Sequence, residues 1–193
     1  MNQVSANVMV LYPGEIPPPG CEDAIKLMLV GSVDARPDGK FDWGGKFING
    51  LVDICDPVKG ILQYRGLRFL VFNSVVPSSN PGAPPTVDNE EFVGKTNWMI
   101  QSIGESDLIF CNFLKKSTNP FPLFWLGLMA QTGKLVVRCP DQYMGYGLVQ
   151  VVCKNYNIPL MPGKVGSVLA IVQAMNTISD VFNLKQDKNQ LPE

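Results

Sequence analysis

The stretch FPLFWLGLMAQTGKLVVRCP, residues 121–140, shows the pattern that decides the fold. Its first half is an apolar run around Trp125 that predicts a helix, and Gly133 is placed to end this helix as a C-cap. Its second half, KLVVRCP, predicts a buried strand. A helix followed by a strand that is apolar throughout is typical of a parallel sheet covered by helices.

The rest of the chain repeats this alternation. Strands are predicted for four more apolar segments: IKLMLVGS (25–32), LRFLVFNSVV (67–76), DLIFCNF (107–113) and a short segment near residue 160. Helices are predicted from residue 42, with Asp42 as N-cap, from residue 89, from about residue 147 and over residues 163–184. The sequence therefore predicts an α/β fold with a doubly wound parallel sheet of about five strands and helices on both faces.

The composition argues against several classes of function. The net charge of −1 gives no reason to expect a nucleic-acid partner, and no apolar run is long enough for a membrane helix. The first residues lack the features of a signal peptide, so we expect a soluble, cytoplasmic protein. The chain has no histidine, which excludes Ser-His-Asp and Cys-His catalysis. Its five cysteines form no CxxC pair, so we expect neither a disulfide framework nor a zinc site, and no cofactor.

We divide the chain into three parts. Residues 1–24 form an extended N-terminal segment, because YPGEIPPPG is rich in proline. Residues 25–183 form a single domain, and residues 184–193 form a polar tail. Ligands of doubly wound folds bind beyond the carboxyl ends of the strands, which places the candidate site in the loops that begin near Gly31, Asn73, Asn112 and Pro140.

A resemblance follows from the order of these motifs. The sequence resembles the nucleoside 2-deoxyribosyltransferase-like family over about residues 25–160. The family's first strand, similar to F-L-A-G-S, is matched by residues 28–32, and the Trp that opens its first helix is matched by Trp43. Its Q-x-x-W-E helix and the A-D that follows are matched by Trp98 and by Ser106-Asp107. Its E-L-G-L-x-A helix is matched by residues 125–130.

The resemblance implies a flavodoxin-like fold and a site for a nucleoside. Enzymes of the family cleave the N-glycosidic bond of a deoxynucleoside through a Glu nucleophile, by a logic that parallels a retaining glycosidase. The resemblance also implies a homo-oligomer, because family members are commonly oligomers.

This sequence departs from the family where the chemistry lies. The nucleophilic Glu is replaced by Trp125, and the Glu expected after Trp98 is Met99. The acidic residue that precedes the nucleophile falls near Asn119, and the Asn that opens the last helix is replaced by Leu148. An indole is no nucleophile, so we expect the usual deoxyribosyl transfer to be lost.

Three readings remain open. The first is a catalytically impaired relative that binds or sequesters a nucleoside- or nucleotide-type ligand, with aromatic rings as a stacking face for a base. Its candidate ligand-binding residues are Gly31, Ser32, Asp34, Trp43, Asn73, Asn112, Asn119, Trp125 and Tyr146. The second is an active N-glycoside hydrolase or transferase that uses a substitute carboxylate, Asp34 or Asp42. The third is an interaction protein with a filled pocket, in which Trp125, Phe121, Phe124 and Leu128 pack against a partner or a second subunit.

Overall fold

Seven strands form one sheet in the computed structural model, which describes residues 2–3, 5, 7–33, 43–60, 64, 66–75, 84–163 and 172. The strands are β1 (Asn2–Gln3), β2 (Val8–Leu11), β3 (Ile25–Gly31), β4 (Phe69–Asn73), β5 (Leu108–Asn112), β6 (Leu135–Cys139) and β7 (Leu160–Pro162). They lie in the order β1-β2-β4-β3-β5-β6-β7. The six strands from β2 to β7 are all parallel, and β1 pairs antiparallel with β2 at the edge.

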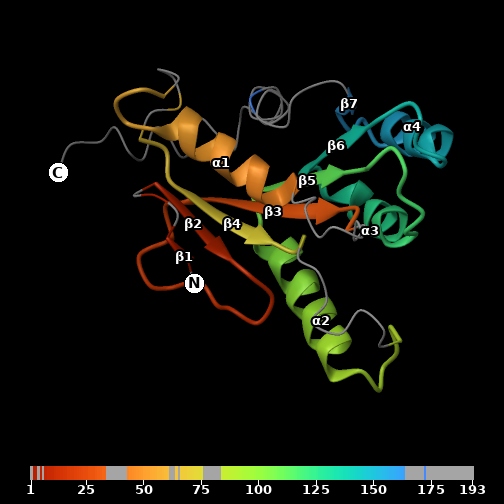
Figure 1. Cartoon of the computed structure of the whole chain (residues 1–193), viewed down its shortest axis with the longest axis horizontal. Helices are drawn as coiled ribbons and strands as arrows, with labels where there is room; N and C mark the ends of the chain where they lie inside the picture. Colours follow the sequence, from red (N-terminus) through yellow and green to blue (C-terminus); the bar gives the residue numbers. More distant parts are fainter. Residues whose placement is uncertain are drawn as a thin grey trace.

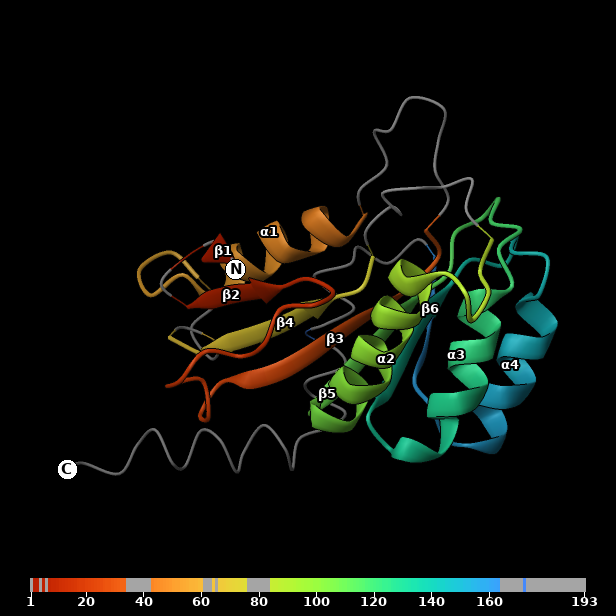
Figure 2. The same ribbon diagram turned by 90° about the horizontal axis from the view of Figure 1, so that it is seen from below.

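Helices cover both faces of this sheet. They are α1 (Trp43–Cys55), α2 (Glu90–Glu105), α3 (Phe121–Met129) and α4 (Tyr146–Asn155), with a short 3-10 turn, η2 (Ala130–Thr132), after α3. Helix α1 lies on one face, and α2, α3 and α4 lie on the other, as Figure 1 shows. The same three helices follow one another across their face in Figure 2.

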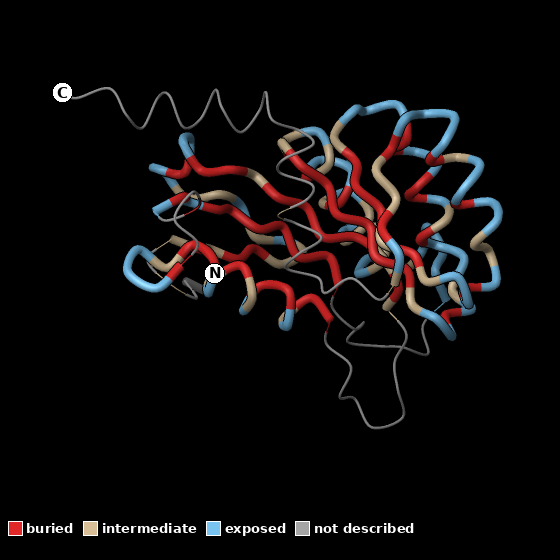
Figure 3. Tube along the Cα trace, turned by 90° about the horizontal axis from the view of Figure 1, so that it is seen from above, coloured by how far each residue is buried: buried red, intermediate tan, exposed pale blue. Residues whose placement is uncertain are grey.

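Each face of the sheet has its own apolar core. Alternate strand residues point to opposite faces, so β3 sends Leu27 and Leu29 toward α1 and Met28 and Val30 toward the other helices. Figure 3 shows the central strands buried along almost their whole length. This two-sided burial explains why the strands read as continuous apolar runs.

The predicted doubly wound parallel sheet is confirmed. It contains six parallel strands where the sequence predicted about five, because β2 pairs with the edge of β4. The predicted C-cap is also confirmed, since Gly133 ends the 3-10 turn with a left-handed φ of 69°.

Some predictions fall outside the described residues. These are Asp34, the proposed N-cap Asp42, the polar tail, and the helix over residues 163–184 except for Gly163 and Val172. Gly163 is a turn residue after β7, and the helical residue Val172 packs against the α1-side core. Within the described part of the chain, no helix combines the length and apolar character needed to cross a bilayer.

Candidate functional site

The order of the strands places the candidate site between β3 and β5. The chain moves outward from β3 in both directions: β4 lies on one side and β5 on the other. β3 is followed by α1 on one face, and β5 is followed by α3 on the opposite face. Connections that leave neighbouring strands toward opposite faces define a topological switch point, where open α/β sheets bind their ligands.

Gly31 ends β3 in close contact with β5. Its φ is +152°, and a Cβ atom at this position would lie 2.1 Å from the carbonyl oxygen of Asn112. No side chain fits in this space, so the sequence motif Val-Gly-Ser needs its glycine to bring the two strand ends together.

Ser32 continues this junction. Its N–H donates to the Asn112 carbonyl oxygen at 2.9 Å, and its Oγ accepts from the N–H of Leu114 at 3.2 Å. Its carbonyl oxygen accepts from Nε1 of Trp43 at 2.9 Å. Ser32 is fully buried, so it joins β3, the segment after β5 and the start of α1.

Asn73 and Asn112 end β4 and β5, and both side chains are buried. The Oδ1 atom of Asn73 accepts from the N–H of Val75 at 3.0 Å, which turns the chain after β4. The Oδ1 atom of Asn112 accepts from Arg138 at 2.9 Å. In the part of the chain that the structure describes, the Nδ2 atom of Asn112 and the Oγ atom of Ser117 are the buried side-chain polar atoms with no hydrogen-bond partner.

Arg138 lies opposite Asn112 in the β5–β6 register, so both side chains point to the α1 face. The guanidinium donates to Asn112 and also to the carbonyl oxygen of Gly163, just after β7. Partial burial lowers the pKa of Arg138, because burial disfavours the charged form. Sequence reasoning missed Arg138, although an arginine inside the apolar run KLVVRCP was a signal for it.

The aromatic residues do not form one stacking face. Trp43 packs on the α1 side of the sheet, edge-on to Phe110 with ring centroids 6.1 Å apart. Trp98 and Trp125 pack on the opposite side. Tyr146 begins α4 on that side too, where its ring is half-buried.

Trp125 is a core residue of α3. Only 6% of its surface is exposed, and it lies in the apolar cluster that also contains Met28 and Val30 of β3. The buried face of α3 is completed by Leu126 and Met129. The indole therefore occupies the layer between α3 and the sheet.

Asn119 lies at the other end of the segment after β5. Its Oδ1 atom accepts from the N–H of Phe121 at 2.9 Å, so it caps a backbone donor at the start of α3. It is half-exposed. Its place two residues before the first residue of α3 makes a structural role sufficient to explain it.

The cysteines are buried free thiols. Burial raises the pKa of Cys55 and Cys139 to about 12 and that of Cys153 to about 11. These thiols stay protonated at neutral pH and are poor nucleophiles and poor metal ligands. Among the described residues, no group of three His, Cys, Asp or Glu side chains is arranged to hold a metal ion.

The chain matches no protein-family model and no curated protein. The candidate site consequently rests on geometry: Gly31, Ser32, Asn73 and Asn112 come together at the ends of three neighbouring strands. Trp43 contacts these residues through the hydrogen bond from its indole N–H to the carbonyl oxygen of Ser32. The side chain of Trp125, in contrast, belongs to the core under α3.

Proposed function

We propose that this chain binds a nucleoside- or nucleotide-type small molecule at the carboxyl ends of β3 and β5, without covalent glycosyl transfer. The resemblance to nucleoside 2-deoxyribosyltransferases suggests the class of ligand. The switch point between β3 and β5 supports the location. The observation that carries the proposal is the amide nitrogen of Asn112, which has no hydrogen-bond partner among the described residues.

The orientation of this amide follows from its neighbour. A guanidinium group can only donate hydrogen bonds, so the atom of Asn112 that faces Arg138 has to be its oxygen. The amide nitrogen then has two N–H groups, and no acceptor for them among the described residues. Leaving a buried donor without a partner costs about 1–3 kcal/mol. An acceptor oxygen of a ligand, such as a keto oxygen of a base or a phosphate oxygen, would recover this free energy.

The absence of glycosyl transfer is argued from Trp125. At the position where the resemblance expects a nucleophilic Glu, the side chain is an indole packed into the core. An indole neither attacks an anomeric carbon nor stabilises an oxocarbenium-like transition state as a carboxylate does. We therefore propose a binding or sequestering role.

A thermal-shift screen with nucleosides and nucleotides tests the binding proposal. A ligand at about 100 times its Kd adds about 2.7 kcal/mol, which raises the Tm of a chain of this size by roughly 5–10 °C. We expect such a shift with at least one member of the panel. Asn112→Asp should abolish it, because the aspartate keeps an acceptor for Arg138 but loses both amide donors.

Asn155→Asp is the matched control. It makes the same replacement at an exposed position at the end of α4, outside the candidate site, so the ligand shift should remain. No shift with any member of the panel would contradict the proposal, and so would a shift that survives Asn112→Asp unchanged. The same samples are assayed for free base after incubation with deoxynucleosides. Base release by the wild type would favour the alternative reading, a hydrolase or transferase that uses a substitute carboxylate.

A further inference from the structure

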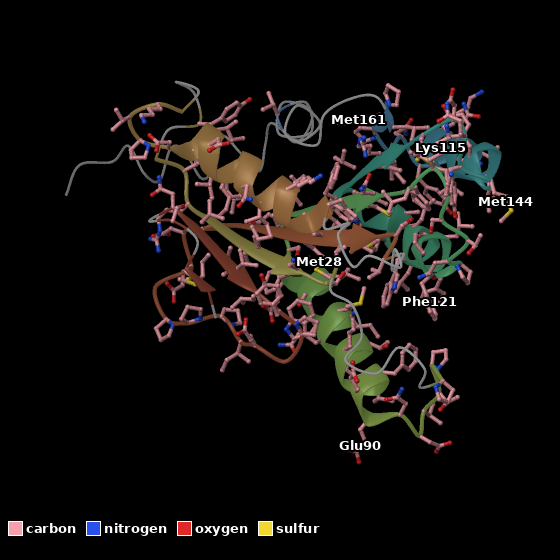
Figure 4. The ribbon with its side chains drawn as sticks, viewed as in Figure 1. Met28, Glu90, Lys115, Phe121, Met144 and Met161 are labelled. Atoms are coloured by element: carbon pink, nitrogen blue, oxygen red, sulfur yellow. The ribbon has the colours of Figure 1, made fainter. Side chains whose placement is uncertain are left out.

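The connection between β2 and β3 contains a proline-rich stretch, EIPPPG (residues 15–20), that is neither helix nor strand. Proline holds its own φ at about −65° and keeps the residue before it in the extended region. Ile16, Pro17 and Pro18 each precede a proline, so these three residues form one turn of a polyproline II helix. In Figure 1 this connection is the red-orange loop beside β2, on the side of α2, and Figure 4 shows side chains projecting from it.

Hydrogen bonds fix both ends of this stretch. At its start, the carbonyl oxygen of Glu15 accepts from Nε1 of Trp98 on α2 at 2.8 Å. The Glu15 carboxylate also accepts from the N–H of Tyr12 at 2.9 Å. At its end, the carbonyl oxygen of Gly20 accepts from the guanidinium of Arg68 at 2.7 Å. The stretch is therefore ordered before any partner binds, which lowers the conformational entropy lost on binding.

One edge of the stretch is exposed. A polyproline II helix has three residues per turn, so residues i and i+3 lie on the same edge. Ile16 and Pro19 stand in this relation, and both are exposed, with 79% of the surface of Ile16 open to solvent. Pro17 and Pro18 are half-buried, so the other two edges lie nearer the body of the chain. We define the proline ridge as residues 16–19, with Ile16 and Pro19 at its exposed edge.

The backbone of the proline ridge offers hydrogen-bond acceptors but few donors. Its three prolines have no N–H group. In the described part of the chain, the carbonyl oxygens of Ile16, Pro17 and Pro18 accept no hydrogen bond. The complement of this surface is a groove of aromatic rings whose indole N–H or phenol O–H groups can donate to these carbonyls.

Other kinds of partner fit the proline ridge less well. A strand that adds to an edge needs backbone N–H donors, which the prolines lack. Nucleic acids and anionic bilayers are bound by Lys and Arg side chains, and residues 15–20 contain none. The remaining mode is the one in which SH3, WW and EVH1 domains hold polyproline II segments in aromatic-lined grooves.

We propose that the proline ridge is a docking site for a protein domain with an aromatic-lined groove that binds polyproline II segments. Ile16 and Pro19 have the same spacing as the two prolines of the PxxP segments that such grooves recognise. The ridge belongs to the connection between β2 and β3, so this contact does not depend on the ligand proposed at the carboxyl ends of β3 and β5.

Titration of the full chain with a panel of isolated SH3, WW and EVH1 domains tests this proposal. Isothermal titration calorimetry should give a Kd below about 100 µM for at least one domain. Ile16→Glu places a charge on the exposed edge and should weaken this binding roughly tenfold or more. Because Ile16 is mostly exposed, the variant should keep the circular dichroism spectrum of the folded chain. A wild-type chain that binds no domain of the panel would overturn the proposal.

Val58→Glu is the matched control, since Val58 is an exposed β-branched residue in the turn after α1, away from the proline ridge in sequence. This variant should bind the domain as tightly as the wild type does. An Ile16→Glu variant that binds equally tightly would show that the ridge is not the contact.

A synthetic peptide of residues 12–20, YPGEIPPPG, gives a second comparison. It carries the same side chains without the hydrogen bonds from Trp98 and Arg68. The peptide should therefore bind the same domain several-fold more weakly than the folded chain, because it has more conformational entropy to lose. A peptide that binds as tightly as the chain, or more tightly, would contradict a ridge that the fold orders for binding.

Discussion

The surroundings of Trp125 give this residue a structural role. The helix around it is apolar, and the buried indole belongs to the same apolar cluster as Met28 and Val30 of β3. The neighbouring ring of Phe124 lies edge-on at 5.2 Å, on the exposed side of the helix. The residue thus contributes to stability through packing.

Replacing Trp125 by Glu should destabilise the fold. The change removes a large buried side chain and introduces a carboxylate into an apolar layer, which together cost about 3–5 kcal/mol. Urea unfolding followed by fluorescence or circular dichroism measures this loss.

Met144→Glu introduces the same side chain at an exposed position and should change the free energy of unfolding by less than about 0.5 kcal/mol. A Trp125→Glu variant as stable as Met144→Glu would show that Trp125 is not part of the core. It would reopen the possibility that the indole lines a pocket.

The sequence predicted the positions of some site residues better than their roles. Asn112 and Asn73 were placed at the candidate site because each follows a strong apolar run, and the structure brings both to that edge. Ser32 was proposed as a ligand contact, and the structure shows its oxygens engaged by Leu114 and Trp43. These partners come from distant parts of the chain, so a local sequence pattern does not reveal them.

At the scale of elements, α2 is a helix that interactions at its first turn stabilise. Two of its sixteen residues, Met99 and Ser102, are buried, so packing alone anchors it weakly. Asn89 caps it: Oδ1 accepts from the N–H of Phe92 at 3.2 Å, and Nδ2 donates to the carbonyl oxygen of Pro84 at 3.0 Å. Glu90 and Glu91 in the first turn add a favourable interaction with the helix dipole.

Asn89→Ala should therefore lower the free energy of unfolding by about 1 kcal/mol. The control is Asn97→Ala, an exposed position in the middle of α2, where alanine has the higher helix propensity and should be neutral or slightly stabilising. Chemical denaturation of both variants gives the difference. Equal effects of the two substitutions would show that the cap contributes nothing measurable.

The strands were predictable to different degrees. β3, β4, β5 and β6 are apolar runs bounded by Gly, Pro, Asn or Asp, and each was placed within two or three residues of its observed bounds. β2 was not predicted because VMVL is only four residues long and precedes a proline-rich segment. Its pairing with β4 is a tertiary contact that local pattern does not encode.

At the scale of the whole molecule, the two cores differ in their content of thiols. Cys111, Cys139 and Cys153 lie in the core beneath α2, α3 and α4, and Cys55 lies in the core beneath α1. Burial raises the pKa of all four, because it disfavours the thiolate. The folded chain holds these protons at a pH where the unfolded chain has released them.

This difference predicts a loss of stability at alkaline pH. A thiol whose pKa is raised on folding contributes its full stabilisation below the unfolded value of 9.0 and loses it as the pH rises toward the folded value of about 12 for Cys139. The urea midpoint should fall with each step above pH 9. Cys139→Ala should make this fall shallower, whereas an unchanged slope would contradict a buried, protonated thiol at this position.

The pairing of β2 also has a consequence for synthesis. Val8 of β2 is translated about sixty residues before its partner in the sheet, Phe69. The nascent chain therefore exposes an apolar strand until β4 has been translated, and β3, made in between, can form its own pairing only with strands that come later. The parallel pairing of β2 and β3 therefore cannot begin before β4 has been translated. A chaperone that binds exposed apolar segments would act at this stage.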